Sequence, residues 1–178
     1  IRDSSVTGVQ TCALPISYDA IASYTFGSAA SSYTFSSIAA SWTDLILIGN
    51  WAQDSGTVRE MAIRLNGDTG TNYSITELYG NGTSAASYRR SNQTYLDICV
   101  NSPAVTKWNV NIVNLQNYSN STTYKTILSR HSSVDSEAEA LVGLWRSTSA
   151  ITSIQLLFEG AVNFMAGTTF TLYGVKSA

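Results

Sequence analysis

The chain has 178 residues and a formal net charge of −2, and 12% of its residues are charged while 11% are aromatic. This length fits one domain whose core needs no disulfide support, and the combination of many aromatics with little charge excludes a disordered chain. Clustered Lys and Arg drive nucleic-acid binding, so the charge balance argues against a nucleic-acid partner. No apolar run approaches the roughly 18 residues that indicate a membrane span.

Residues 1–16 read IRDSSVTGVQTCALPI and resemble the conceptual translation of a short-read sequencing adapter, which reproduces Val6 to Ile16 without a mismatch. A signal peptide would instead begin with charged residues followed by an apolar stretch. We therefore expect residues 1–16 to be an artefact of an environmental assembly and residues 17–178 to form one native domain. Cys12 then falls outside the native part, and Cys99 alone gives neither a disulfide framework nor a metal-ligand spacing.

From Ser17 onward, strand-like runs alternate with turn residues, and no segment has a sustained helical period. The predicted strands cover residues 18–26, 31–38, 43–52, 57–66, 72–79, 94–100, 106–116, 123–131, 137–146, 151–158 and 164–175. Short strands at roughly ten-residue spacing predict an all-β fold, an antiparallel β-sandwich of jelly-roll type. Asn66-Gly67 and Asn81-Gly82 supply the positive φ angles of tight turns. The stretch 80–93 is predicted to be an exposed loop, where recognition tends to concentrate.

Alternation within the runs predicts which side chains face the core, because antiparallel strands commonly have one buried and one wet face. The apolar members of three such runs are expected inside: Met61, Ile63 and Leu65; Trp108, Val110 and Ile112; Ile154, Leu156 and Phe158. The segment Leu45–Ile48 is apolar on both faces, which predicts a central strand or an interface strand. In the last run we expect Phe164, Phe170 and Leu172 to be buried, and the native fold to end at Lys176.

The sequence offers no strong catalytic or metal-binding pattern. His131 is the only histidine, and a structural zinc site needs about four Cys or His ligands, so zinc is not expected within one chain. The loop 66–72 has oxygen ligands for calcium but only one carboxylate, which favours a plain turn.

Glu137 and Glu139 share one face of a strand at a spacing that a glycosidase could use. Any two glutamates separated by one residue in a strand would match that spacing equally well. With His131 as its only possible base and no G-x-S-x-G elbow, a serine triad is not expected. We therefore predict no catalytic residue, no cofactor and no metal ligand.

Four residues in or beside the stretch 80–93 are candidates for contact with a glycan or a protein partner: Tyr88, Arg89, Arg90 and Tyr95. The four tryptophans could stack on sugar rings, but large aromatics usually anchor cores. The Arg89-Arg90 doublet by itself is typical of a solvated loop.

Several phrases along the chain occur in a characteristic order. They are Tyr18-Asp-Ala-Ile-Ala22; Phe35-Ser-Ser-Ile38 with Trp42-Thr-Asp-Leu-Ile-Leu47; Arg64-Leu-Asn-Gly-Asp68 with Asn72-Tyr-Ser74 and Leu78-Tyr-Gly-Asn-Gly82; and Gly143-Leu-Trp145 with Ala150-Ile-Thr-Ser-Ile154 and Phe170-Thr-Leu-Tyr-Gly-Val-Lys176. Together they resemble a widespread group of uncharacterised virion proteins of tailed bacteriophages, over nearly all of residues 17–178. The group usually also carries an IPNY phrase, for which this chain has Val113-Asn-Leu-Gln-Asn-Tyr118, a partial departure.

The resemblance implies a non-enzymatic structural protein located on the virion, such as a capsid decoration, a head fibre or a tail-tip component. We expect symmetric copies of the chain, as a trimer, and other virion proteins as partners, with no nucleic acid and no membrane. Two alternatives stay open. One is a glycan-binding or receptor-binding module of a phage fibre that uses the stretch 80–93 and Tyr88. The other is a glycoside hydrolase, which requires Glu137 or Glu139 in an open cleft.

Overall fold

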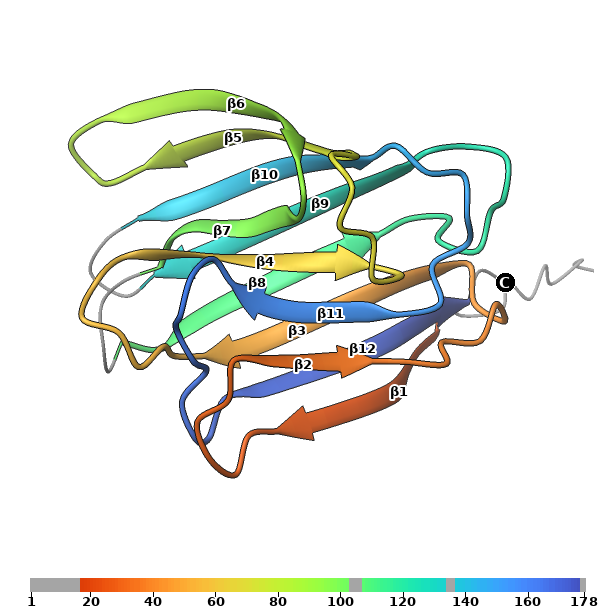
Figure 1. The fold of residues 1–178 in the computed structure, drawn as a ribbon, viewed down its shortest axis with the longest axis horizontal. Coiled ribbons are helices and arrows are strands. Elements are labelled where there is room, and N and C mark those ends of the chain that lie inside the picture. Colours follow the sequence, from red (N-terminus) through yellow and green to blue (C-terminus); the bar gives the residue numbers. More distant parts are fainter. Residues whose placement is uncertain (1–16, 103–106, 134–136, 177–178) are drawn as a thin grey trace, which may run out of the picture.

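A computed structural model describes residues 17–102, 107–133 and 137–176. In these ranges the protein consists of β-strands in two antiparallel sheets, without a helix (Figure 1). The strands are β1 (Ser17–Thr25), β2 (Ser32–Phe35), β3 (Asp44–Trp51), β4 (Arg59–Leu65), β5 (Tyr73–Gly80), β6 (Ala85–Gln93), β7 (Leu96–Ser102), β8 (Asn109–Leu115), β9 (Lys125–Ser133), β10 (Ala138–Trp145), β11 (Ile154–Phe158) and β12 (Thr169–Lys176).

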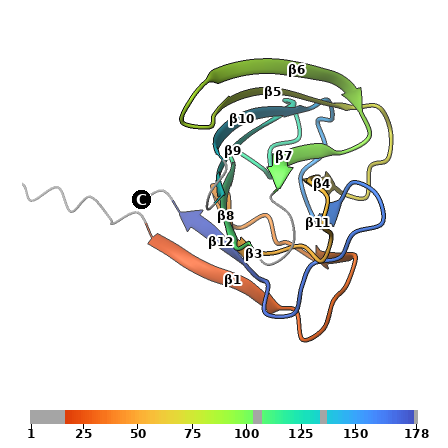
Figure 2. The ribbon, with the colours of Figure 1, turned by 90° about the vertical axis from the view of Figure 1, so that its left-hand side faces the viewer.

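The two sheets form a β-sandwich, as predicted from the sequence. One sheet has eight strands in the order β1-β12-β3-β8-β9-β10-β5-β6, and the other has four in the order β2-β11-β4-β7. The chain repeatedly crosses between them, and only β5-β6 and β8-β9-β10 are consecutive strands of one sheet. The four-stranded sheet covers one face of the larger sheet, and no further strand from the described ranges covers the opposite face (Figure 2).

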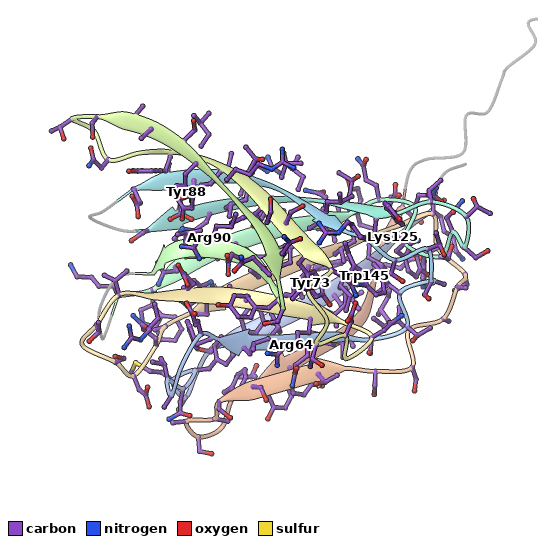
Figure 3. The ribbon with its side chains drawn as sticks, turned by 45° about the horizontal axis from the view of Figure 1, so that its top comes forward. Arg64, Tyr73, Tyr88, Arg90, Lys125 and Trp145 are labelled. Atoms are coloured by element: carbon purple, nitrogen blue, oxygen red, sulfur yellow. The ribbon has the colours of Figure 1, made fainter. Side chains whose placement is uncertain are left out.

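The core lies between the sheets. Met61, Ile63 and Leu65 on β4 and the alternate residues of β11 are buried, which confirms the predicted parity of both strands. Tyr73 on β5 and Trp145 on β10 are register partners whose rings stack with centroids 6.3 Å apart (Figure 3). At the end of the chain, the predicted burial of Phe164, Phe170 and Leu172 is confirmed.

The turn at Asn66-Gly67 joins β4 to β5 and has positive φ angles of 53° and 67°, as its sequence predicts. The Asn66 side chain also connects this turn to the segment before β11, because its Oδ1 accepts the Thr152 N–H at 2.8 Å. In the same turn, the Asp68 carboxylate accepts the indole N–H of Trp145 at 2.7 Å and the side-chain amide of Asn72 at 2.9 Å. These contacts give Asp68 a structural role and favour the plain-turn interpretation of residues 66–72.

The prediction for β8 was wrong. Asn109 and Asn111 face the core and are buried, whereas Trp108 and Val110 are 41% and 45% exposed. The amides are tolerated inside because they are hydrogen-bonded. The Asn111 Oδ1 accepts the indole N–H of Trp51 at 2.7 Å, and its Nδ2 donates to the Ile98 carbonyl at 2.7 Å.

The stretch 80–93 is not a loop. Residues 85–93 form β6, which pairs with β5 in an antiparallel hairpin, and only residues 81–84 form the connection. Within that turn, the Asn81 Oδ1 accepts the backbone N–H groups of Thr83 and Ser84. The predicted exposed loop is therefore an edge strand of the eight-stranded sheet.

Candidate functional site

The outer face of the eight-stranded sheet, which turns away from the four-stranded sheet, is a candidate interaction surface (Figure 2). The strand register places outward side chains in continuous rows across the strands. One row runs Ile48, Ile112, Arg130, Ala140, Leu78. The adjacent row runs Ile46, Asn114, Leu128, Val142, Thr76.

Large apolar side chains are openly exposed on this face. Leu78 is 60% exposed, Val142 51%, Leu128 42% and Ile48 38%. Scattered exposed apolar residues are normal, but contiguous apolar patches usually mark an interaction site. Leu128 and Val142 are register partners, and Ile48 and Leu78 lie in the adjacent row, where Ile48 pairs with Ile112. The two rows together therefore form a contiguous patch.

Arg130 is the charged residue in the middle of the outer face. Its strand, β9, lies between β8 and β10 near the centre of the strand order, and its register partners are Ile112 and Ala140. It borders three surface hollows of about 500, 390 and 160 Å³. The ion pairs among the described residues do not include Arg130. A partner that covers this face must therefore accommodate a guanidinium group surrounded by apolar side chains.

The four predicted contact residues do not form one exposed site. Arg89 points to the outer face and is exposed, whereas Tyr88 is half-buried and packs against the core. Arg90 is also half-buried, close to Tyr88 along β6 (Figure 3). Tyr95 lies just before β7 and is half-buried beside Glu159.

Arg90 lies among several carboxyl groups. It forms ion pairs with Glu60 and with Asp97, whose Oδ2 is 3.3 Å from its Nη1. Burial raises the pKa of Asp97 to about 7, because Glu60 adds to this effect and Arg90 only partly opposes it. Burial also raises the pKa of Glu77, while the Tyr88 hydroxyl beside it acts in the opposite direction. Arg90 and Tyr88 are thus engaged with carboxyl groups inside the protein, which makes them poor candidates for glycan contact.

A second cluster lies between the sheets and contains Cys99 of β7, His131 of β9 and Glu139 of β10. All three residues are buried, and one potential ligand atom from each lies within 4.8 Å of those of the other two. The Cys99 Sγ is 3.5 Å from the His131 Nε2, and the His131 Nδ1 is 3.7 Å from the Glu139 Oε2. Burial lowers the pKa of His131 to about 4, so its ring is neutral at neutral pH. This donor set could hold a metal ion.

The two residues of the predicted pair, Glu137 and Glu139, have different surroundings. Glu139 is buried, and its Oε2 accepts the Val100 N–H at 2.9 Å, whereas Glu137 precedes β10 and is half-buried. Glu139 therefore does not lie in an open cleft, as the hydrolase alternative requires.

Comparison with known proteins finds no family model that matches the chain, and no curated protein matches it either. None of the described residues belongs to a helix with the length and apolar character needed to cross a membrane.

Proposed function

We propose that this protein is a non-enzymatic structural protein of a bacteriophage particle and that symmetric copies of it associate through the outer face. The contiguous exposed apolar surface of that face carries the proposal, since monomeric proteins rarely expose large patches of this kind. The ordered phrases that resemble tailed-phage virion proteins support the assignment to a particle. The strand order is compatible with a jelly roll in which the meander β8-β9-β10 takes the place of one strand.

A second copy is the favoured occupant of the outer face because the face carries few charges. In the two rows described above, Arg130 is the only charged side chain, and the remaining members are aliphatic or neutral polar. Interface centres are depleted of charged residues in the same way. A stable association through this face would bury the area of a typical interface, about 1,600 Å² in total.

A matched pair of valine variants tests the interface. Val142 on the outer face is 51% exposed, and Val58, in the segment before β4, is 49% exposed. We expect Val142→Lys to abolish self-association in light scattering coupled to size exclusion, because the interface would then bury an unpaired ammonium group. Val58→Lys should behave like the wild type.

The same measurement gives the number of copies in the assembly, which the sequence analysis predicts to be three. A wild-type chain that stays monomeric at high concentration would contradict association through the outer face. An assembly that Val142→Lys leaves intact would place the interface elsewhere. The assignment to a phage particle is tested separately, by locating the chain in a cryo-EM map of the particle.

A further inference from the structure

The hydrogen bonds of Asn109 fix the state of the His131 ring. The Asn109 Nδ2 donates to the Lys107 carbonyl at 3.0 Å and to the Trp51 carbonyl at 3.5 Å, so its Oδ1 is the acceptor of the side chain. That oxygen is 3.2 Å from the His131 Nε2. In a neutral imidazole only one nitrogen carries a proton, so Nε2 donates to Asn109 and Nδ1 carries a lone pair.

The lone pair on the His131 Nδ1 faces another acceptor. Nδ1 is buried and has no hydrogen-bond partner among the described residues, and the Glu139 Oε2 lies 3.7 Å away. That oxygen already accepts the Val100 N–H at 2.9 Å, which favours an ionised carboxylate. Two electron-pair donors in the interior with no proton between them form an unfavourable contact unless a positive charge lies close to both.

We propose that Cys99, His131 and Glu139 form a buried binding site for a divalent transition-metal ion of zinc type. Zinc bonds of about 2.0–2.3 Å at tetrahedral angles separate neighbouring ligand atoms by roughly 3.3–3.8 Å. The distance of 3.7 Å between the His131 Nδ1 and the Glu139 Oε2 falls in this range. One potential ligand atom from each of the three residues lies within 4.8 Å of those of the other two, so ligation brings the Cys99 sulfur closer to the ion. Three protein ligands leave one tetrahedral position for water or another oxygen ligand.

The net charge of the site and the types of its ligand atoms indicate which ion it would bind. A thiolate on Cys99 and a carboxylate on Glu139 together carry two negative charges, so a divalent cation makes the buried site neutral. A soft thiolate with an imidazole favours zinc and similar transition metals over magnesium or calcium, which prefer oxygen ligands alone. The cluster is therefore chemically distinct from the carboxyl groups around Arg90.

The surroundings of the three ligands match those of metal sites. Metal-bound histidines usually donate their second ring N–H to an oxygen acceptor, as the His131 Nε2 does to Asn109. The Trp51 ring stacks on the imidazole with centroids 5.8 Å apart. Because Cys99 belongs to the four-stranded sheet and the other two ligands to the eight-stranded sheet, a bound ion would connect the two layers of the sandwich.

Cobalt(II) is the probe that tests the site, because its absorption spectrum reports both thiolate ligation and tetrahedral geometry. The full chain is refolded with one equivalent of Co²⁺. We expect a thiolate-to-metal charge-transfer band and intense visible bands, and we expect added Zn²⁺ to abolish both. Cys12→Ser removes the only other thiol of the chain and should leave the spectrum unchanged. Cys99→Ala should remove the charge-transfer band.

Glu139→Gln tests the carboxylate, because it keeps the shape of the side chain and removes the charge. We expect at least a tenfold loss of Zn²⁺ affinity, measured by competition with a chromophoric chelator, and circular dichroism of each variant checks that it folds. If a variant does not fold, the wild-type and Cys12→Ser spectra still decide. The absence of a charge-transfer band from both, or its persistence in a folded Cys99→Ala protein, would overturn the proposal.

Discussion

At the scale of single residues, the buried amides of β8 lie in the core because their hydrogen bonds are satisfied. Asn111 is buried, and its side-chain oxygen accepts the Trp51 indole N–H while its side-chain nitrogen donates to the Ile98 carbonyl. We predict that Asn111→Leu lowers the free energy of unfolding by about 2 kcal/mol, because it leaves a buried indole N–H without its partner. Urea denaturation measures the change.

Asn114 on the same strand supplies the control for that substitution. It points to the outer face and is half-buried, and the bonded amide network of Asn111 does not include it. Asn114→Leu should therefore alter stability by less than about 0.5 kcal/mol, the range usual for surface positions. Equal losses in both variants would mean that leucine is poorly tolerated on β8 for another reason.

Residue by residue, the sequence predicts the apolar core better than the polar interior. Alternation places Met61, Ile63 and Phe170 correctly because these strands have one polar and one apolar face. It fails at Asn109 and Asn111, where neighbours distant in sequence satisfy the amides. Local spacing in the sequence does not indicate that Cys99, His131 and Glu139 meet, because only the pairing of β9 with β10 and the position of β7 bring them together.

At the scale of elements, Gly143 allows β7 to lie against β10. A Cβ at this position would meet the buried Leu96 side chain, with Cγ at 2.8 Å and two methyl carbons also too close. We predict that Gly143→Ala costs about 1–3 kcal/mol of stability, the usual range for overpacking in a core. Chemical denaturation should give a lower midpoint with an unchanged slope.

Two further variants isolate the cause of that loss. Gly27 has no atom within 4 Å of a built Cβ and no positive φ, so Gly27→Ala should be close to neutral. Combining Gly143→Ala with Leu96→Ala should cost less than the sum of the two single changes, because the contact that creates the strain is removed. Strict additivity would contradict the steric explanation.

The elements themselves were largely predictable, and the exception is informative. Strands with alternating or continuous apolar residues are predictable, because burial on one face gives alternating apolar residues and burial on both faces gives a continuous apolar run. The strand β6 was missed because it is an edge strand rich in Ser, Arg and Asn. Its conformation comes from pairing with β5, and pairing between backbones leaves little trace in composition.

At the scale of the whole molecule, the position of Arg130 determines how salt should affect self-association. Arg130 lies near the middle of the outer face, so copies that associate through this face bring their guanidinium groups toward one another. Like charges repel, and added salt screens the repulsion because the Debye length is about 10 Å at 0.1 M and about 3 Å at 1 M. We predict that the wild-type protein associates more tightly at high salt, by roughly fivefold, which corresponds to about 1 kcal/mol between two such charges.

The variant Arg130→Leu should associate about tenfold more tightly than the wild type at low salt and lose most of the salt dependence, since it removes both charges and adds apolar surface. Sedimentation equilibrium at two ionic strengths measures both effects. Arg89→Leu is the matched control, because Arg89 also points to the outer face but lies on the edge strand β6, far along the strand order from β9. If salt weakens the association instead, Arg130 meets a carboxylate of the neighbouring copy, and the two copies do not pack with their outer faces centred on each other.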